Sequence, residues 1–334
     1  MVKVSVIIPV YAVPQKYLRA CFDSLAAQTL QESEFIVVSD GAPEVECSIC
    51  EEYMTTDKRF KFFKREHAGV SVARNYGISQ SQGEYVSFVD ADDWIERDTL
   101  DLLYQNAEAW DSEIINTNYI TYKNNLPQRI LWSNLSKERL DEEDKASILN
   151  EFISLKDNSI PRGVCAKLYK RSFLNEIQAR FNENIKIQED TLFNQICFSK
   201  ARNISYLNKL LYHYQENSDS ATRRYRKDYL EMHIQAMIEI EKISNFQQKT
   251  LIGREMVRLF YLSWDYSYMN PKNTDNFFTR MGDLSKMIRS NDFQFLISNV
   301  VLMGLPFLVR FELFLFKKKI VFPIWLHGLK KLIV

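Results

Sequence analysis

The chain has 334 residues and carries 43 basic and 43 acidic side chains. This balance gives no overall positive field, so the sequence argues against nucleic acid as a partner. A composition of 46% hydrophobic and 26% charged residues, with only 9 Gly and 8 Pro, is typical of a folded globular protein and excludes a low-complexity chain.

The first 116 residues alternate between apolar strand-like runs and segments with helical spacing. The expected strands are KVSVIIPV, EFIVVSD, FKFFKR and YVSFVD, and helices are expected between them. Apolar strands separated by helices predict an α/β fold with a parallel sheet covered on both faces. No cleavage site follows the run from Val4 to Val10, so we interpret it as a buried strand rather than a signal peptide and expect a cytoplasmic protein.

The rest of the chain is predicted to become increasingly helical. The segment from Asn118 to Tyr214 is less regular, with a helix after Asp190 and one or two strands in ISYLNKLLYHYQ. From Arg226 onward two long periodic segments, YLEMHIQAMIEIEKISNF and LIGREMVRLFYLSWDYSYM, predict helices. The five cysteines are scattered and odd in number, so we expect reduced thiols.

The tail from Phe293 to Val334 has a different character. It contains six basic residues against one acidic residue, Glu312, among many aromatic and aliphatic side chains. Polar interruptions and Pro306 make it unsuitable for a membrane-spanning helix, which needs about 20 apolar residues. The pattern favours a segment that lies on the inner face of the cytoplasmic membrane. The alternative is a helical cap packed on the domain or on a second subunit, which would give a homodimer through the C-terminal helices.

Polar side chains are expected at the ends of three strands. Tyr11 follows the first strand, Asp40 ends the second, and the run from Asp90 to Asp93 ends the fourth. In a parallel sheet these ends lie on one edge, where ligands bind. The clustered carboxylates suit a hard divalent cation, Mg²⁺ or Mn²⁺, that holds phosphates. No glycine-rich loop follows the first strand, which argues against a dinucleotide fingerprint or a P-loop and favours a metal–diphosphate site.

Seven motifs make the sequence recognisable. In chain order they are VSVIIPVY, SLAAQTL, EFIVVSDGAPE, GVSVARNYGI, GEYVSFVDADDW, KLYKRSFL and EDTLFNQ. Together they resemble the family 2 glycosyltransferases with a GT-A fold, especially the bacterial enzymes that build capsular, exopolysaccharide or lipopolysaccharide chains. The resemblance covers about residues 2–215. It implies a Rossmann-like, mostly parallel sheet flanked by helices and followed by a helical C-terminal region.

The resemblance also implies an activity. This is inverting transfer from a nucleotide sugar, usually a UDP-sugar, to a glycan or lipid-linked acceptor, with Mn²⁺ or Mg²⁺ as cofactor. Tyr11 would stack on the base, Asp40 would hydrogen-bond it, and Arg74 would approach the nucleotide or order the loop around it. Asp90 would contact the ribose or the second shell of the metal ion, and Asp92 would bind the ion directly.

The same resemblance makes Asp190 the general base that deprotonates the acceptor hydroxyl. Asp190 also suits the N-cap of the helix that follows, and its neighbour Glu189 is the alternative base. Pro9 and Ala91, from two of the motifs, are further candidates for binding the nucleotide sugar.

Four weaker candidates have ordinary structural alternatives. Asp93 could cap a turn rather than bind the metal ion. Lys167 is either a phosphate or acceptor contact or a solvated lysine. His213 is more often a core or edge histidine than a metal ligand, and Arg223 lies in a polar loop that could close over the diphosphate or remain a plain surface loop.

Several positions depart from the family pattern. Ala12 stands where Asn is frequent, His67-Ala68 replaces Asn-Gly, and Cys165 stands where an aromatic side chain is common. Ser39 and Ala42-Pro43 are further departures. Because Asp40 and the Asp-Ala-Asp run are retained, these changes bear on the identity of the donor and acceptor rather than on activity itself.

We divide the chain into a catalytic domain, a helical region and a tail. The ranges are 1–222 (donor part about 1–116, acceptor part about 117–222), 223–292 and 293–334. Two rival functions remain open at this point. One is a nucleotidyl- or phosphoryltransferase of similar fold, and the other is a non-catalytic subunit that binds a nucleotide sugar in a polysaccharide synthesis complex.

Overall fold

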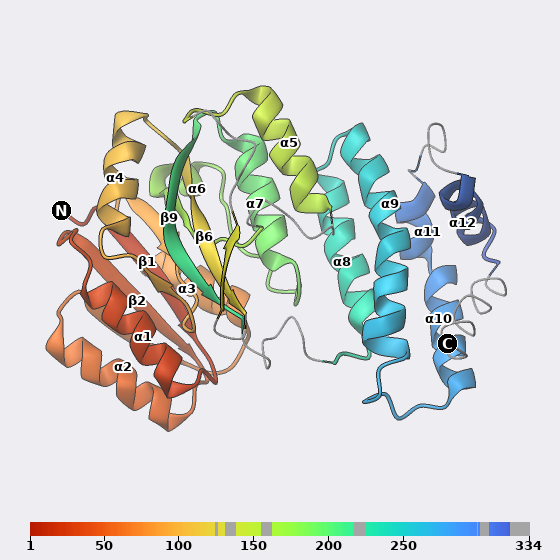
Figure 1. The fold of residues 1–334 in the computed structure, drawn as a ribbon, viewed down its shortest axis with the longest axis horizontal. Coiled ribbons are helices and arrows are strands. Elements are labelled where there is room, and N and C mark those ends of the chain that lie inside the picture. The colour runs from red at the N-terminus through yellow and green to blue at the C-terminus, as the bar shows by residue number, and fades with distance from the viewer. Residues whose placement is uncertain are drawn as a thin grey trace. The chain divides into compact units, whose positions relative to one another are not determined.

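The computed structural model describes residues 1–123, 126–130, 138–154, 162–216, 225–298, 300 and 307–320. The chain divides into two compact units, drawn as ribbons in Figure 1. The first unit contains residues 1–149 and 158–218, and the second contains residues 150–157 and 219–334. The boundaries of the predicted catalytic domain, helical region and tail remain predictions.

The first unit is built on a nine-stranded sheet. Its strands are β1 (Val4–Val10), β2 (Ser33–Asp40), β3 (Phe60–Arg65), β4 (Tyr85–Phe88), β5 (Trp94–Ile95), β6 (Ile114–Lys123), β7 (Leu126–Ile130), β8 (Lys167–Lys170) and β9 (Ile204–Gln215). Their order is β3-β2-β1-β4-β8-β6-β9-β5, and β7 pairs with β6. Strands β1 to β4 are parallel to one another, β8 lies antiparallel between β4 and β6, and β6 and β9 are again parallel. The sheet is therefore mostly parallel, as predicted.

Helices cover both faces of the parallel part of this sheet (Figure 1). The helices described in this unit are α1 (Gln15–Ala26), α2 (Glu44–Thr56), α3 (Val70–Gln80), α4 (Thr99–Ala109), α5 (Glu142–Ile153), α6 (Arg171–Glu176) and α7 (Glu189–Lys200), and the last turn of α5 is assigned to the second unit. On one face Leu18 of α1 shares a buried cluster with Val6 and Ile8 of β1. On the other face α3 lies so close to β1 that a Cβ at Gly77 would clash with Ile7. Alternate β1 side chains thus face opposite helical layers.

The long elements predicted from periodicity are present, and ISYLNKLLYHYQ forms the single strand β9. Its pairing with β6 shifts around Thr117 and Asn118. Strands β5, β7 and β8 were not predicted, because they have two, five and four residues and are too short to show a period. The predicted α/β architecture, with helices after the sheet, is confirmed.

The second unit is helical, as predicted. Its helices are α8 (Tyr229–Lys242), α9 (Phe246–Ser263), the π-helical turn η1 (Trp264–Tyr268), α10 (Phe277–Arg289), α11 (Asn291–Ser298) and α12 (Phe307–Lys317). Gly253 lets α9 pack closely on α11, because a Cβ there would clash with Val300 and lie 3.0 Å from the Leu296 carbonyl oxygen. The rings of Phe293 and Phe316 pack edge to face and join α11 to α12.

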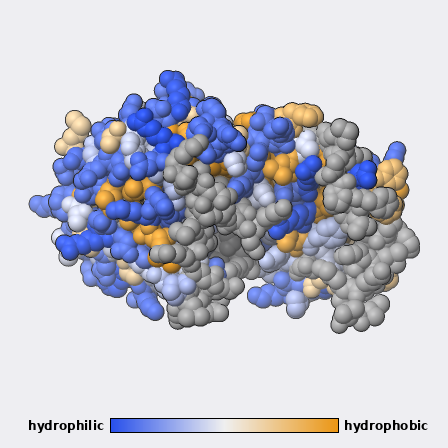
Figure 2. All heavy atoms as spheres, turned by 45° about the horizontal axis from the view of Figure 1, so that its top comes forward, coloured by the Kyte–Doolittle hydropathy of each residue, from blue (hydrophilic) through white to orange (hydrophobic). Residues whose placement is uncertain are grey.

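In the tail, α11 and α12 bury one face and expose the other. Leu296, Leu313 and Phe316 are fully buried, whereas Phe295 and Phe314 are 48% and 47% exposed. The inner face is therefore part of the core of this unit. Over the described residues, no helix combines the length and apolarity needed to cross a bilayer. The surface of the described residues that is visible in Figure 2 is mainly hydrophilic, with hydrophobic side chains in separate patches.

Candidate active site

The loop between β3 and α3 is hydrogen-bonded to the end of β2. Asp40 is 4% exposed, and its carboxylate accepts hydrogen bonds from the backbone N–H groups of Ala68 and Gly69 at 2.7 to 3.0 Å. His67 Nδ1 lies 3.0 Å from Asp40 Oδ2. Gly41 makes this contact possible, because a Cβ there would lie 2.8 Å from His67 Cβ. Both oxygens of Asp40, the residue predicted to bind the base, are thus engaged by the protein.

Two aromatic rings lie beside this loop. The Tyr11 phenol ring stacks on the His67 imidazole, with ring centroids 4.3 Å apart and an interplanar angle of 19°. Tyr11 is half-exposed, as a base-stacking residue must be. Because His67 covers one face of the Tyr11 ring, a nucleotide base can stack only on the opposite face. His67 was noted in the sequence as a departure from the family pattern but was not predicted as part of the site.

Ala12, next to Tyr11, has a left-handed backbone conformation with φ +48°. L-residues other than Asn and Asp disfavour this region, because Cβ approaches the following carbonyl oxygen. Ala12→Asn should therefore raise the free energy of unfolding by about 0.5 kcal/mol, measured by urea denaturation. Ala12→Val is the matched control at this exposed position and should lower the free energy of unfolding. An Asn variant no more stable than the parent would contradict the prediction.

The residues from Asp90 to Asp93 form a turn after β4. Asp93 is fully buried, its Oδ2 accepts a hydrogen bond from the Tyr212 hydroxyl at 2.5 Å, and its Oδ1 accepts one from the Gln215 N–H at 2.8 Å. Burial, together with the charges of Asp90 and Asp92, raises the pKa of Asp93 well above its usual range. Asp93 therefore anchors the acidic loop to β9. Tyr212 was not predicted as part of the site.

A group of possible metal ligands lies in the same region. One ligand atom from each of Asp90, Asp93 and Cys165 lies within 4.8 Å of the others. Asp92, the predicted direct ligand, is half-buried in the same loop but does not belong to this group. Burial and the neighbouring carboxylates raise the pKa of Cys165 well above its usual range. Two of the three ligand atoms are carboxylate oxygens, and oxygen ligands suit Mg²⁺ or Mn²⁺.

Arg74, on α3, connects the acidic loop to the start of α7. Its side chain is only 4% exposed and its guanidinium contacts three carboxylates. Nη2 lies 2.9 Å from Asp90 Oδ1, and Nη1 lies 2.6 Å from Asp190 Oδ1 and 3.2 Å from Glu189 Oε1. The Nε–H is buried and has no hydrogen-bond partner among the described atoms. Arg74 thus contacts both Asp90, the predicted donor-site carboxylate, and Asp190, the predicted base.

Asp190 lies in the first turn of α7. The helix begins at Glu189, and Gln188 holds the N-cap position in a left-handed conformation with φ 59°, so Asp190 is not the cap that the sequence allowed. Burial, with repulsion from Glu189 and Asp90, raises the pKa of Asp190 to about 7, although Arg74 opposes this shift. A carboxyl group that titrates near neutrality is well matched to general-base catalysis.

The weaker candidates occupy structural positions. Lys167 is buried rather than solvated, and its ammonium donates to the Gly163 carbonyl oxygen at 2.6 Å. Burial lowers its pKa to about 8. His213 Nε2 lies 2.8 Å from a Glu96 carboxylate oxygen, and its ring stacks on Trp94. These contacts agree with the core or edge histidine that the sequence favoured.

The remaining candidates are placed as follows. Pro9 lies in β1 opposite Val38 of β2, and Ala91 is buried in the acidic loop. Arg223 lies outside the described residues. The first unit thus brings the acidic loop, Arg74 and the start of α7 into direct contact.

Comparisons with known proteins identify the family and the fold. The family model described as glycosyl transferase family 2 matches residues 5–177. Glycosyltransferase GlyA of Streptococcus pneumoniae is 33% identical over 71% of this chain and 34% of its own length. Uncharacterized glycosyltransferase EpsJ of Bacillus subtilis is 32% identical over 75% of this chain and 71% of its own length. This chain therefore spans about a third of GlyA and most of EpsJ.

A solved structure shares the fold. The crystal structure of Staphylococcus aureus TarS residues 1–349 in complex with UDP-GlcNAc has a TM-score of 0.66 and 21% identity, covering 96% of this chain and 88% of that chain. A mostly parallel sheet with carboxylates at the ends of its strands, followed by helices, is the GT-A architecture that the motifs predicted. The chain belongs to glycosyl transferase family 2. The predicted family and fold are confirmed.

Proposed function

We propose that this chain is an inverting glycosyltransferase that moves a sugar from a UDP-sugar to a glycan or lipid-linked acceptor in bacterial surface polysaccharide synthesis. The observation that carries the proposal is the contact of Arg74 with both Asp90 and Asp190, which joins the acidic loop to the base candidate. Relatives support the donor class. TarS is a poly(ribitol-phosphate) beta-N-acetylglucosaminyltransferase, and its structure contains UDP-GlcNAc.

Inverting transfer is a single displacement at the anomeric carbon. The acceptor hydroxyl attacks while UDP leaves from the opposite face, so its proton must be removed as the new bond forms. We assign Asp190 this role because Arg74 holds its Oδ1 at 2.6 Å and because its pKa, raised to about 7, suits a general base. Glu189 shares Arg74 and is the alternative base.

We also propose Mn²⁺ or Mg²⁺ as the cofactor, with Asp92 as its direct ligand. When bound, the ion would neutralise the diphosphate and stabilise UDP as the leaving group. The residues of the acidic loop supply oxygen ligands, and Asp93 keeps the loop fixed to β9 through the Tyr212 hydroxyl and the Gln215 N–H. Tyr11 would present a ring face to the base, and Asp40 would order the loop beside it.

The proposal is tested by a screen of UDP-sugars with and without Mn²⁺. We expect slow release of UDP from the correct donor, because water can replace the acceptor. Release of pyrophosphate from a nucleoside triphosphate and a sugar phosphate would instead support the rival nucleotidyltransferase. Binding of UDP-sugars without any turnover would support the non-catalytic subunit. Family membership and the joint presence of the acidic loop and Asp190 favour the transferase.

For the location we propose the inner face of the cytoplasmic membrane, reached through the outer face of α12. Arg310, Phe311, Phe314 and Lys318 are exposed and recur at the spacing of one helical face. The opposite face carries Leu313 and two further buried side chains of the core. Aromatic side chains flanked by cations on an exposed helical face suit the surface of an anionic bilayer.

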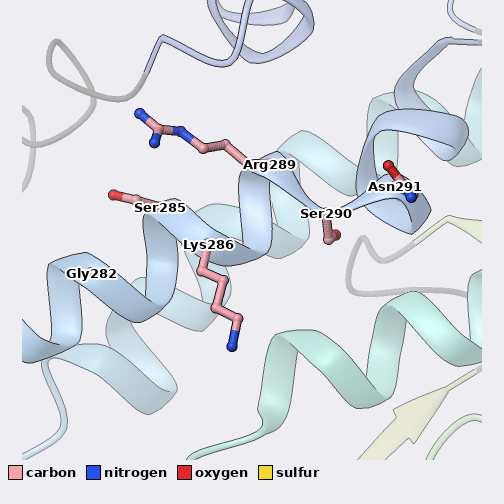
Figure 3. A pocket seen from close by; sticks show the side chains of 6 residues that line it. All are labelled: Gly282, Ser285, Lys286, Arg289, Ser290 and Asn291. Atoms are coloured by element: carbon pink, nitrogen blue, oxygen red, sulfur yellow. The ribbon is translucent and has the colours of Figure 1, made fainter.

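A basic hollow lies near the end of this helix. The Gln294 side-chain amide donates to the carbonyl oxygens of Ile288 and Phe316, at 2.8 and 2.9 Å, and so joins the ends of α10 and α12. An open hollow of about 780 Å³ lies where α10 ends and α11 begins, and Figure 3 shows its lining. The lining residues are Gly282, Ser285, Lys286, Arg289, Ser290 and Asn291. Its two cations add to the positive charge at this end of the second unit.

Phe314→Ser and Lys318→Ala should each weaken binding to phosphatidylglycerol vesicles at low salt. Loss of one cation near an anionic surface removes about 1 kcal/mol, or about fivefold in partitioning, and the effect should fade at high ionic strength. Vesicle co-sedimentation is the measurement, and Lys58→Ala, an exposed lysine of the first unit, is the matched control. Parental binding by both Phe314→Ser and Lys318→Ala would contradict the proposal. A concentration-dependent change of mass in Phe314→Ser would favour the homodimer instead.

A further inference from the structure

The Arg74 guanidinium joins two segments that the chain places far apart. Nη2 donates to Asp90, after β4, and Nη1 donates to Asp190 and Glu189, at the start of α7. A guanidinium is planar and presents its N–H groups in a fixed fork. Bonds from one fork to both segments therefore fix the separation of Asp90 and Asp190 and the direction of the Asp190 carboxylate.

The guanidinium is also held by an aromatic pair. Its central carbon lies 5.3 Å from the centroid of the Phe181 ring, and Phe181 stacks on Phe193 with centroids 4.2 Å apart and planes 5° apart. Phe193 belongs to α7, the helix that carries Asp190. The same helix thus supplies both the carboxylate that Arg74 holds and the ring that supports its aromatic neighbour. Lysine could keep the charge but could provide neither the fork nor the flat face.

We propose that Arg74 is a positioning residue that holds Asp190 at a set place relative to the acidic loop and does not bind the nucleotide. This inference rests on the proposed function, because it takes Asp190 as the base. The family resemblance implied that Arg74 approaches the nucleotide or orders the loop around it, and the inference replaces the first of these two roles. The reason is geometric: both terminal nitrogens of Arg74 are already bonded to carboxylates. The buried Nε–H has no hydrogen-bond partner among the described atoms.

Two measurements on Arg74→Lys separate positioning from nucleotide binding. The first is UDP affinity in Mn²⁺ by titration calorimetry, which should stay within about threefold of the parent. The second is UDP release from UDP-GlcNAc at saturating donor, whose kcat should fall about 10- to 100-fold, because small displacements of a catalytic group are costly. A loss of UDP affinity greater than about tenfold, with the fold intact, would overturn the inference.

A double variant gives the sharper test. Arg74→Lys/Asp190→Asn should release UDP no more slowly than Asp190→Asn alone, because a residue that acts through the base then has nothing left to position. If the losses in the rate of UDP release of the two single variants multiply in the double variant, Arg74 acts on the donor directly. If Asp190→Asn keeps the parental rate, the proposed base is wrong, and the UDP-affinity measurement still decides whether Arg74 binds the nucleotide.

A second variant covers the case in which Arg74→Lys does not fold. Phe181→Leu removes only the ring beside the guanidinium and leaves every carboxylate in place. This variant should keep its UDP affinity and have a lower kcat, which is the pattern expected for Arg74→Lys. A Phe181→Leu protein with parental kcat, together with an unfolded Arg74→Lys, would reduce Arg74 to a structural ion pair and overturn the inference.

Discussion

Asp190→Asn should fold, bind UDP in Mn²⁺ with nearly parental affinity and lower turnover of a UDP-sugar by roughly 10²–10⁴-fold. Asparagine has the shape of aspartate but cannot take up the hydroxyl proton. It keeps an oxygen for the hydrogen bond from Arg74, now 2.6 Å long, so the start of α7 should stay in place. Release of UDP at saturating donor is the measurement, with titration calorimetry for UDP affinity.

The neighbouring acid provides the matched control. Glu189→Gln removes one negative charge from the same guanidinium and should reduce turnover much less, since Glu189 lies farther from Arg74, at 3.2 Å. The pH profile tests the same assignment. A raised pKa keeps Asp190 protonated to higher pH, so the base form is lost on the acid side and kcat/KM should rise between about pH 6 and pH 8. A large loss in Glu189→Gln and none in Asp190→Asn would reverse the two roles.

The parallel half of the sheet could be predicted because its strands are continuous apolar runs with helices between them. The short strand β5 could not be predicted. Trp94 and Ile95 carry no periodicity, and they form a strand only because they pair with His213 and Tyr212, far along the chain. That pairing also brings the Tyr212 hydroxyl to Asp93. The burial of one carboxylate of the acidic cluster is thus a consequence of tertiary structure that no local pattern encodes.

The candidate site, too, could be predicted only in part from the sequence. Motifs placed Arg74, Asp90 and Asp190 in the sequence, and the rule that ligands bind at strand ends placed Asp90 at the edge of the sheet. Arg74 is 16 residues from Asp90 but 116 residues from Asp190, and the second ion pair forms because α7 begins against α3. Only the fold supplies that information. The sequence therefore predicted these three residues as site candidates but not that one guanidinium connects them.

The tail packs against the rest of the second unit through one helical face, and its association with a membrane remains a prediction. Its apolar residues were ascribed either to a membrane surface or to packing, and one helical face now packs while the other is exposed. Leu313 and Phe316 point into the core, whereas Phe314 lies on the exposed face of the same helix. Removal of the whole tail would uncover the core of the second unit. Point variants on the outer face of α12 are therefore the cleaner test of membrane binding.

Asp92→Asn should abolish the metal-dependent part of UDP binding and leave the protein folded. A direct ligand should matter at least as much as outer partners, whose loss weakens metal affinity by about 10–100-fold. Removing one charge beside Asp90 and the buried Asp93 relieves repulsion, so the free energy of unfolding should stay the same or rise. Titration of UDP with Mn²⁺ and with a chelator measures the first effect, and urea denaturation measures the second.

Asp93→Asn separates the two possible ligand sets. Asp93 belongs to the group with Asp90 and Cys165, whose ligand atoms lie within 4.8 Å of one another, whereas Asp92 does not. If Asp92 binds the ion, Asp93→Asn should keep most of the metal-dependent affinity, since Asn can still accept a hydrogen bond from Tyr212 or from the Gln215 N–H. The opposite result, with UDP affinity kept in Asp92→Asn and lost in Asp93→Asn, would make the buried group the metal site. In that case Asp92 would only tune the charge of the loop.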